Sequence, residues 1–302
     1  MKEINLGVLV YQNQYLPECS SVNVGDYIQS LAALNIYKKI IEEKLNTSFK
    51  IDEFTNLVLE NNIDGFNFVF IKRDNLHEQS QYQGLDDIIT IMNGWWMWPF
   101  NKNKELSFDI PKNLKPIFTS FHIYDNNLLN EKNIKTFEKF QPIGCRDIDT
   151  LNKLKSKNID CFFSGCLTTT IDFYNWQGQD SDSVLLVDYN KNNLNTNESR
   201  VTHHTPEVKE DFEKGLKLGL RLLKKYSLCK KVYTSRLHCY LPCLAMGVPV
   251  EFNYGDNSVL NTWGTGHERF KGLKTLSSNN DDFKKIQTNL NRIAQHIKSM
   301  IQ

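Results

Sequence analysis

Apolar residues in this chain gather in short runs, and between the runs they recur every three or four positions. Short runs that are apolar throughout predict strands of a parallel sheet covered on both faces, and the wider spacing predicts helices with one buried stripe. The predicted strands are residues 4–10, 66–71, 88–92, 116–119, 142–145, 161–163, 184–187, 231–234 and 248–252. The predicted helices are residues 26–45, 132–140, 147–157, 207–228, 235–246 and 281–301.

This alternation of strands and helices predicts an α/β fold with a mainly parallel sheet. A polar linker at residues 176–183 separates a Rossmann-like N-terminal domain, residues 1–177, from a Rossmann-like C-terminal domain, residues 178–280. The last helix, within residues 281–302, is expected to pack back on the first half. Most predicted strands end in polar residues, and open α/β sheets bind ligands at the carboxyl ends of their strands. The predicted site is therefore a cleft between the two domains.

Composition excludes several function classes. With 36 basic and 35 acidic residues, the net charge of +1 offers no electrostatic case for nucleic acid. The longest apolar runs have strand length, so no transmembrane segment is expected, and the first residues lack the features of a signal peptide. Seven cysteines without C-x-x-C spacing indicate a reduced, cytoplasmic protein with no zinc site. Since neither G-x-G-x-x-G nor a P-loop occurs, no dinucleotide cofactor is expected.

The stretch that concentrates the chemistry is residues 231–249, a strand, a helix and a second strand. Ser235 is the predicted N-cap of the helix and Gly247 its terminator. Arg236 and His238 then occupy the first turn, where free N–H groups and the helix dipole favour an anion. These two side chains can hold and act on a phosphate or carboxylate. The alternative is an arginine paired with a surface acid and a histidine satisfied in the core.

Other polar groups stand at comparable positions. Gly25 can let a ligand or another backbone come close, and Asp26 suits a helix N-terminus. Arg146 follows a strand, with Asp147 as the expected helix cap, so Arg146 is expected to point into the cleft or to pair with Asp26 or Asp149. The remaining candidates have structural alternatives: Cys166 in a tight packed turn, His203 and His204 as phosphate ligands or an exposed loop, and Trp95, Trp96 and Trp98 as a sugar-stacking or core cluster.

Three motifs in order resemble the polysaccharide pyruvyl transferase family. The first is N-x-G-D-x-x-Q, with Asn23, Gly25, Asp26 and Gln29; the second is C-R-D-x-x-T, from Cys145 to Thr150, followed by S-G-C-L-T. The third is T-S-R-L-H ahead of L-x-x-G-x-P, which ends at Pro249. The resemblance runs from about residue 20 to residue 252.

The resemblance implies a glycosyltransferase-B-like pair of Rossmann-like domains that builds a cyclic pyruvate ketal on a sugar or lipid-linked glycan, with phosphoenolpyruvate as donor and no cofactor. His238 would be the general acid, and Asp26 or His122 could be the general base. The donor would be bound by Ser235, Arg236, Leu237, Arg146, His203 and His204. The acceptor side would include Asn23, Gly25, Gln29, Asn93 and His122. A peripheral membrane contact stays open, and the residues do not predict the oligomeric state.

Two other readings remain open. A nucleotide-sugar glycosyltransferase could use the same frame, with a diphosphate at Arg236 and His238 and with residues 95–98 or Tyr254 stacked on base or sugar. Its metal could sit at a D-x-D triplet, residues 147–149 or 180–182, but such triplets are common by chance and no metal site is expected. The third reading is a glycan-binding protein that has lost catalysis.

Overall fold

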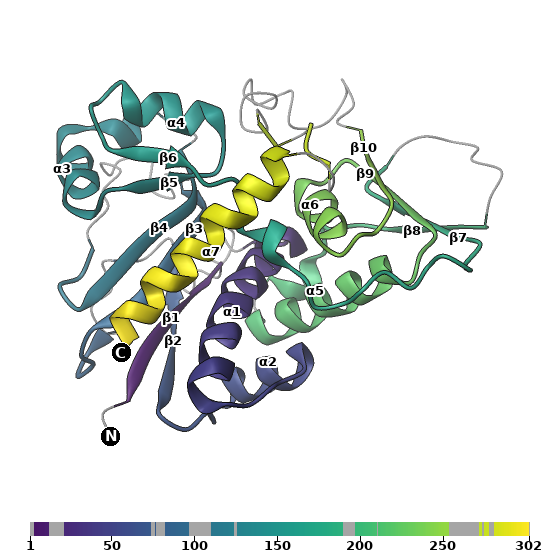
Figure 1. Ribbon diagram of the computed structural model, residues 1–302, viewed down its shortest axis with the longest axis horizontal. Coiled ribbons are helices and arrows are strands. Elements are labelled where there is room, and N and C mark those ends of the chain that lie inside the picture. The colour runs from purple at the N-terminus through teal and green to yellow at the C-terminus, as the bar shows by residue number, and fades with distance from the viewer. Residues whose placement is uncertain are drawn as a thin grey trace.

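The computed structural model of the protein describes residues 3–11, 21–73, 76, 82–96, 110–123, 126–189, 197–209, 211–253, 272–273, 275–277 and 281–301. These residues form two parallel sheets with helices between and around them (Figure 1). The strand order is β2-β1-β3-β4-β5-β6 in the first sheet and β10-β9-β7-β8 in the second. The fold is mixed α/β and glycosyltransferase-B-like, as predicted.

The first sheet comprises β1 (Ile4–Val10), β2 (Phe66–Lys72), β3 (Ile88–Trp96), β4 (Leu114–Ile123), β5 (Ile143–Cys145) and β6 (Cys161–Phe163). The second comprises β7 (Ser183–Val187), β8 (Asn197–Val201), β9 (Lys231–Thr234) and β10 (Val250–Phe252). The helices are α1 (Val24–Leu45), α2 (Ile51–Leu59), α3 (Glu131–Phe140), α4 (Ile148–Lys155), α5 (Phe212–Ser227), α6 (Leu237–Ala245) and α7 (Asp281–Ile301). Short 3-10 helices are η4 (Asn126–Leu129), η5 (Leu167–Thr170) and η6 (Pro206–Val208).

Every predicted strand and helix overlaps an observed one, while α2 and β8 were not predicted. The sequence of β8 is Asn-Glu-Ser-Arg-Val, and it lies at an edge of the second sheet, where only one neighbour covers it. Its residues are mostly polar, so β8 has no apolar run from which a strand could be predicted. Strands β3 and β4 extend beyond their predicted carboxyl ends because the parallel ladder resumes at Gly94 and Phe121 after a register shift next to Met92.

Helices α1, α5 and α6 lie between the two sheets (Figure 1). Two glycines allow α5 to approach α1 closely: a Cβ on Gly215 would lie 2.3 Å from the ring of Tyr27, and one on Gly219 would lie 2.9 Å from Leu31. One hydrophobic cluster therefore runs from the first sheet through these helices to the second. The domain boundary at residues 177 and 178 stays a prediction, because this shared core joins the halves.

Helix α7 crosses the front of the molecule in Figure 1 and contacts α1 and η5. The side chain of Gln287 donates to the carbonyl of Thr169, and Lys44 donates to the carbonyl of Ile301. The final helix thus lies against elements of the first half. None of the helices in the described ranges combines the length and apolar character that a membrane crossing requires.

Candidate active site

Two loops from opposite halves meet at the N-terminus of α1. Asn23 and His204 form an isolated antiparallel bridge, in which Val24 N–H donates to His203 O at 2.8 Å and Thr205 N–H donates to Val22 O at 2.9 Å. Asn23 also caps α1, since its Oδ1 accepts from Gly25 N–H at 3.0 Å. The start of the first helix is therefore fixed to the chain that follows β8.

Gly25 lies directly beside His238. A Cβ added at Gly25 would stand 3.0 Å from His238 Nδ1 and 3.2 Å from His238 Cβ. Gly25 thus allows a close approach, but the neighbour is the side chain of the third motif's histidine and not the ligand or backbone expected from the sequence. The N-termini of α1 and α6 consequently face one place, and both favour negative charge. We call Asn23, Gly25, Asp26, Arg236 and His238 the helix-end cluster.

Hydrogen bonds connect Asp26, Gln29 and Asn93. Asp26 Oδ2 accepts from Ser21 Oγ at 2.5 Å, and its Oδ1 accepts from Gln29 Nε2 at 3.0 Å. Gln29 is buried, and its backbone carbonyl accepts from Asn93 Nδ2 at 3.1 Å. Both carboxylate oxygens of Asp26 are therefore oriented by the first half of the chain.

Arg236 is held by an acid that the sequence analysis did not select. Its Nε donates to Asp188 Oδ2 at 2.7 Å, and the same carboxylate accepts from His203 N–H at 2.9 Å. Burial would raise the pKa of Asp188, but hydrogen bonds from His203 and Thr202 and the charge of Arg236 lower it below its ordinary value. Asp188 follows β7 directly, so its place at the carboxyl end of a strand was the available signal.

The predicted N-cap role of Ser235 is wrong. Helix α6 begins at Leu237, with Arg236 at the N-cap position and no side-chain cap. Ser235 Oγ instead donates to the carbonyl of Asp188 at 2.6 Å. The hydroxyl of Ser235 is thus bonded to the backbone at the end of β7 and not to its own helix. This bond and the Asp188 carboxylate together fix the segment that carries Arg236.

The two adjacent histidines have different surroundings. His203 is buried, with its Nε2 2.6 Å from Tyr226 Oη. Burial, together with the charge of Arg236, lowers the pKa of His203 to about 3, so the ring is neutral near pH 7. Its burial and neutrality argue against direct phosphate binding. His204 is exposed, and partial desolvation and the Arg236 charge lower its pKa while Asp188 and Asp26 oppose them.

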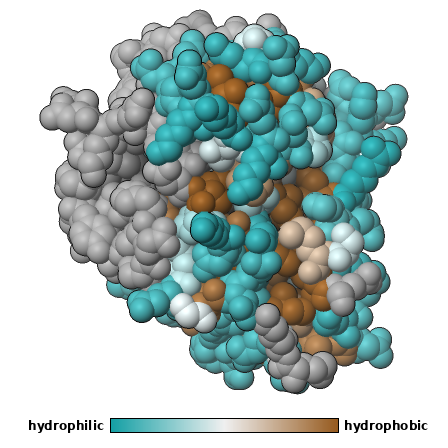
Figure 2. All heavy atoms as spheres, turned by 90° about the vertical axis from the view of Figure 1, so that its left-hand side faces the viewer, coloured by the Kyte–Doolittle hydropathy of each residue, from teal (hydrophilic) through white to brown (hydrophobic). Residues whose placement is uncertain are grey.

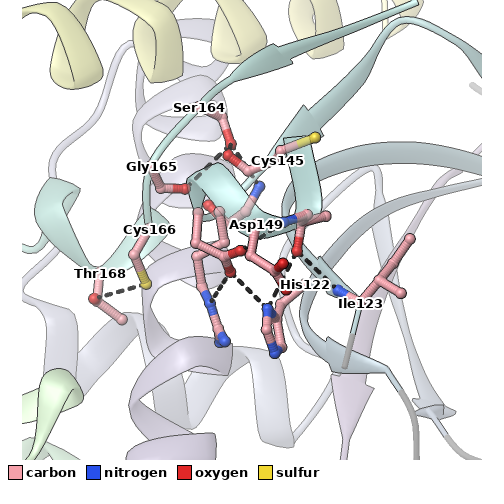
Figure 3. Close-up of polar contacts among 12 residues, drawn as sticks. His122, Ile123, Cys145, Asp149, Ser164, Gly165, Cys166 and Thr168 are labelled. Atoms are coloured by element: carbon pink, nitrogen blue, oxygen red, sulfur yellow. Dashed lines mark hydrogen bonds and ion pairs between the residues drawn. The ribbon is translucent and has the colours of Figure 1, made fainter. Parts of the chain in front are cut away.

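A second group of charged residues lies buried at the ends of β4 and β5 (Figure 3). His122 Nδ1 is 2.6 Å from Asp147 Oδ2, and Arg146 Nε is 3.7 Å from the same oxygen. Asp147 also caps α4 by accepting from Thr150 N–H at 2.8 Å, as predicted. Burial raises the pKa of Asp147, but His122, Arg146 and the Thr150 N–H bring it below its ordinary value. The carboxylate is therefore ionised, and His122 Nδ1 donates to it.

The expected partners of Arg146, Asp26 and Asp149, are replaced by Asp147. Asp149 pairs with Lys153 at 2.7 Å on the outside of α4. Burial raises the pKa of the Cys166 thiol, and the charge of Arg146 opposes this with a smaller effect. The packed turn predicted there is confirmed, since Gly165 has a φ of 67° and its Cα faces Ile286.

The helix-end cluster combines a guanidinium, an imidazole, a carboxylate and two helix N-termini, a set that can bind an anion and transfer a proton. Across the described parts of the chain, no three His, Cys, Asp or Glu side chains are grouped to hold a metal ion. Of the proposed stacking residues, Trp98 and Tyr254 lie outside the described residues, as does the side chain of Trp95, while Trp96 is buried in the core. The donor, acceptor and catalytic roles assigned from the sequence stay predictions.

The chain matches the model of a known protein family. A family model described as polysaccharide pyruvyl transferase matches residues 23–250, which is most of the chain. The match begins at Asn23 and includes the segment of Arg236 and His238, so it spans the whole helix-end cluster. No curated protein matches the chain.

Proposed function

Because the chain belongs to the polysaccharide pyruvyl transferase family, we propose that it transfers pyruvate from phosphoenolpyruvate to a sugar as a cyclic ketal. The family consists of transferases that act in polysaccharide biosynthesis. The acceptor would be a glycan or a lipid-linked sugar of bacterial surface-polysaccharide assembly, and the reaction would take place in the cytoplasm.

The observation that carries this proposal is the contact between Gly25 and His238. It joins the first and third family motifs, which are more than two hundred residues apart in sequence. A reaction between an anionic donor and a neutral sugar needs cations and an acid on one side and a hydroxyl acceptor site on the other. The helix-end cluster supports the proposal because it offers a guanidinium and an imidazole at the start of α6 and a carboxylate at the start of α1.

Arg236 is suited to the donor. Its Nε is used by Asp188, and the two terminal nitrogens are the ones that can hold a phosphate or carboxylate in bidentate fashion. The first turn of α6 adds the positive end of a helix dipole, with Leu237 and His238 as its first residues. Arg146 is proposed as a further donor ligand, since it is buried beside a single carboxylate.

In the proposed reaction His238 gives its proton to the methylene carbon of phosphoenolpyruvate. The adjacent carbon becomes oxocarbenium-like, and one acceptor hydroxyl oxygen forms a bond to it. Asp26, whose oxygens are oriented by Ser21 and Gln29, would take the proton of that hydroxyl. A second hydroxyl of the same sugar then displaces inorganic phosphate and closes the ketal. The overall balance is donor plus diol giving ketal plus phosphate.

An acceptor panel tests the proposal. Purified protein is incubated with phosphoenolpyruvate and lipid-linked or free oligosaccharides, and phosphate release and product mass are measured. We expect an acceptor-dependent release of phosphate and a product heavier by pyruvate less one water. His238→Asn should abolish both, and full activity in that variant would contradict the assigned acid.

A further inference from the structure

A cavity of about 460 Å³ lies between α7 and the strands β4 to β6. Its apolar lining includes Ile117, Phe140, Phe162 and Ile293. Figure 2 views the molecule from the left-hand side of Figure 1 and shows apolar residues gathered in patches bordered by hydrophilic ones. Pro116 and Ile117, near the start of β4, line the cavity, whereas the helix-end cluster is at carboxyl strand ends. The cavity is therefore separate from the proposed active site.

Two of the residues that line the cavity, Phe118 and Phe140, are held by aromatic packing. Phe118 is buried and makes edge contacts with Phe121 and Phe137, at ring-centroid distances of 5.1 and 5.9 Å. It also lies 6.4 Å from the ring of Phe140, over which Lys139 Nζ stands at 4.8 Å. The hydrophobic core therefore fixes this part of the cavity lining.

One face of α7 supplies the polar rim. Asn289, Arg292 and His296 all line the cavity and recur at helical spacing. Asn289 is anchored, since its Nδ2 donates to Phe163 O at 3.2 Å. Arg292 and His296 are exposed, and within the described ranges neither forms an ion pair, whereas Lys298 on the same helix pairs with Glu43. No acidic side chain is among the described residues that line the cavity.

We propose that this cavity binds a single-chain amphipathic anion, an alkyl chain that ends in a phosphate or carboxylate. The chain would lie on the phenylalanine and isoleucine lining, and the head group would meet Arg292 and His296. A few hundred cubic ångströms with an apolar lining and a few placed polar groups is typical of a small-molecule site. A cation with no acid beside it favours an anionic head. The inference is independent of the pyruvyl transfer proposed above.

Calorimetric titration with decyl phosphate, kept below its micelle concentration, tests the site. We expect saturable binding of one molecule per chain, with inorganic phosphate and decanol each at least tenfold weaker because each offers half of the interaction. The double variant Arg292→Gln/His296→Gln should bind at least tenfold more weakly. Lys284→Gln/Lys285→Gln, which removes two charges from α7 away from the cavity, should bind like the wild type.

Arg236→Ala separates this cavity from the donor site, because a phosphate ligand could also enter there. Decyl phosphate binding unchanged in that variant supports the cavity, and binding lost in it overturns the assignment. The proposal is also overturned by the absence of saturable binding, by equal affinity in the Arg292/His296 variant, or by binding to phosphatidylglycerol vesicles alone.

Discussion

Arg236 and Asp188 are joined by a 2.7 Å hydrogen bond across 48 positions of sequence. Asp188 holds the Nε of Arg236 from the end of β7, while its own backbone has a φ of 49° and its carbonyl accepts from Ser235. A left-handed aspartate is uncommon and persists where its surroundings fix it. The orientation of the guanidinium is therefore built into the second sheet before any donor arrives.

Replacement of Asp188 by asparagine should weaken donor binding through Arg236. Asparagine can still accept from His203 N–H, but the charge-assisted bond to Arg236 is lost, at a cost of roughly 1.5–3 kcal/mol, or about ten- to hundredfold in the donor dissociation constant. Titration calorimetry with phosphoenolpyruvate measures this. In the Arg236→Ala background the same substitution should have little further effect, and two fully additive losses would contradict a positioning role for Asp188.

Replacement of Gly25 by alanine should reduce activity far more than stability. The new methyl group would meet His238 Nδ1 at 3.0 Å, so the imidazole must move by a few tenths of an ångström. A misplaced general acid lowers kcat, by roughly ten- to a hundredfold. The measurement is kcat for phosphate release beside the unfolding midpoint in urea.

Gly219→Ala is the comparison for that variant. It also adds a methyl group at a packed contact, 2.9 Å from Leu31, but in the interface of α1 and α5 rather than at the helix-end cluster. We expect it to lower stability and leave kcat near the wild-type value. An equal loss of kcat in both variants would show that Gly25 acts through general packing.

The buried, neutral His203 predicts a stability that depends on pH. Its pKa is lowered from the ordinary histidine value of 6.5 to about 3 in the folded state, so the unfolded chain binds an additional proton between these values. The stabilising contribution is present above about pH 6.5 and is lost as pH falls toward 3. Urea unfolding at several pH values should show the wild type weakening over this window.

His203→Gln should flatten that dependence, because glutamine does not titrate. The loss of the contact with Tyr226 will also lower the free energy of unfolding at neutral pH, so the slope against pH is the decisive quantity. An unchanged slope in this variant would mean that other groups, such as Asp147, produce the acid sensitivity.

Local pattern was sufficient for the fold, and contacts between distant segments limited the prediction of the site. The apolar runs predicted β1, β6 and β9 at their observed bounds, because polar residues border each of these strands. The edge strand β8 was missed because its sequence is polar. The capping role predicted for Ser235 is wrong because it rested only on the residues of the following helix. The hydroxyl of Ser235 instead donates to the carbonyl of Asp188, 47 positions away at a strand end.

The same limit applies to charged pairs. The sequence predicted that Arg146 could pair with Asp26 or Asp149, yet its partner is the adjacent Asp147. The same carboxylate also binds His122, which comes from another strand. Asp188 was overlooked because nothing near it in sequence identifies Arg236 as its partner. Gly25 was identified as a point of close approach, and only the folded chain shows that His238 is what approaches it.

The most direct test of the central claim is a thermal-shift comparison of phosphoenolpyruvate with UDP-, GDP- and CMP-sugars, on the wild type and on Arg236→Ala. A ligand that binds the folded state raises the melting temperature by mass action. The account predicts stabilisation by phosphoenolpyruvate that disappears in Arg236→Ala. Stabilisation by a nucleotide sugar alone would contradict it and identify a glycosyltransferase on the same fold.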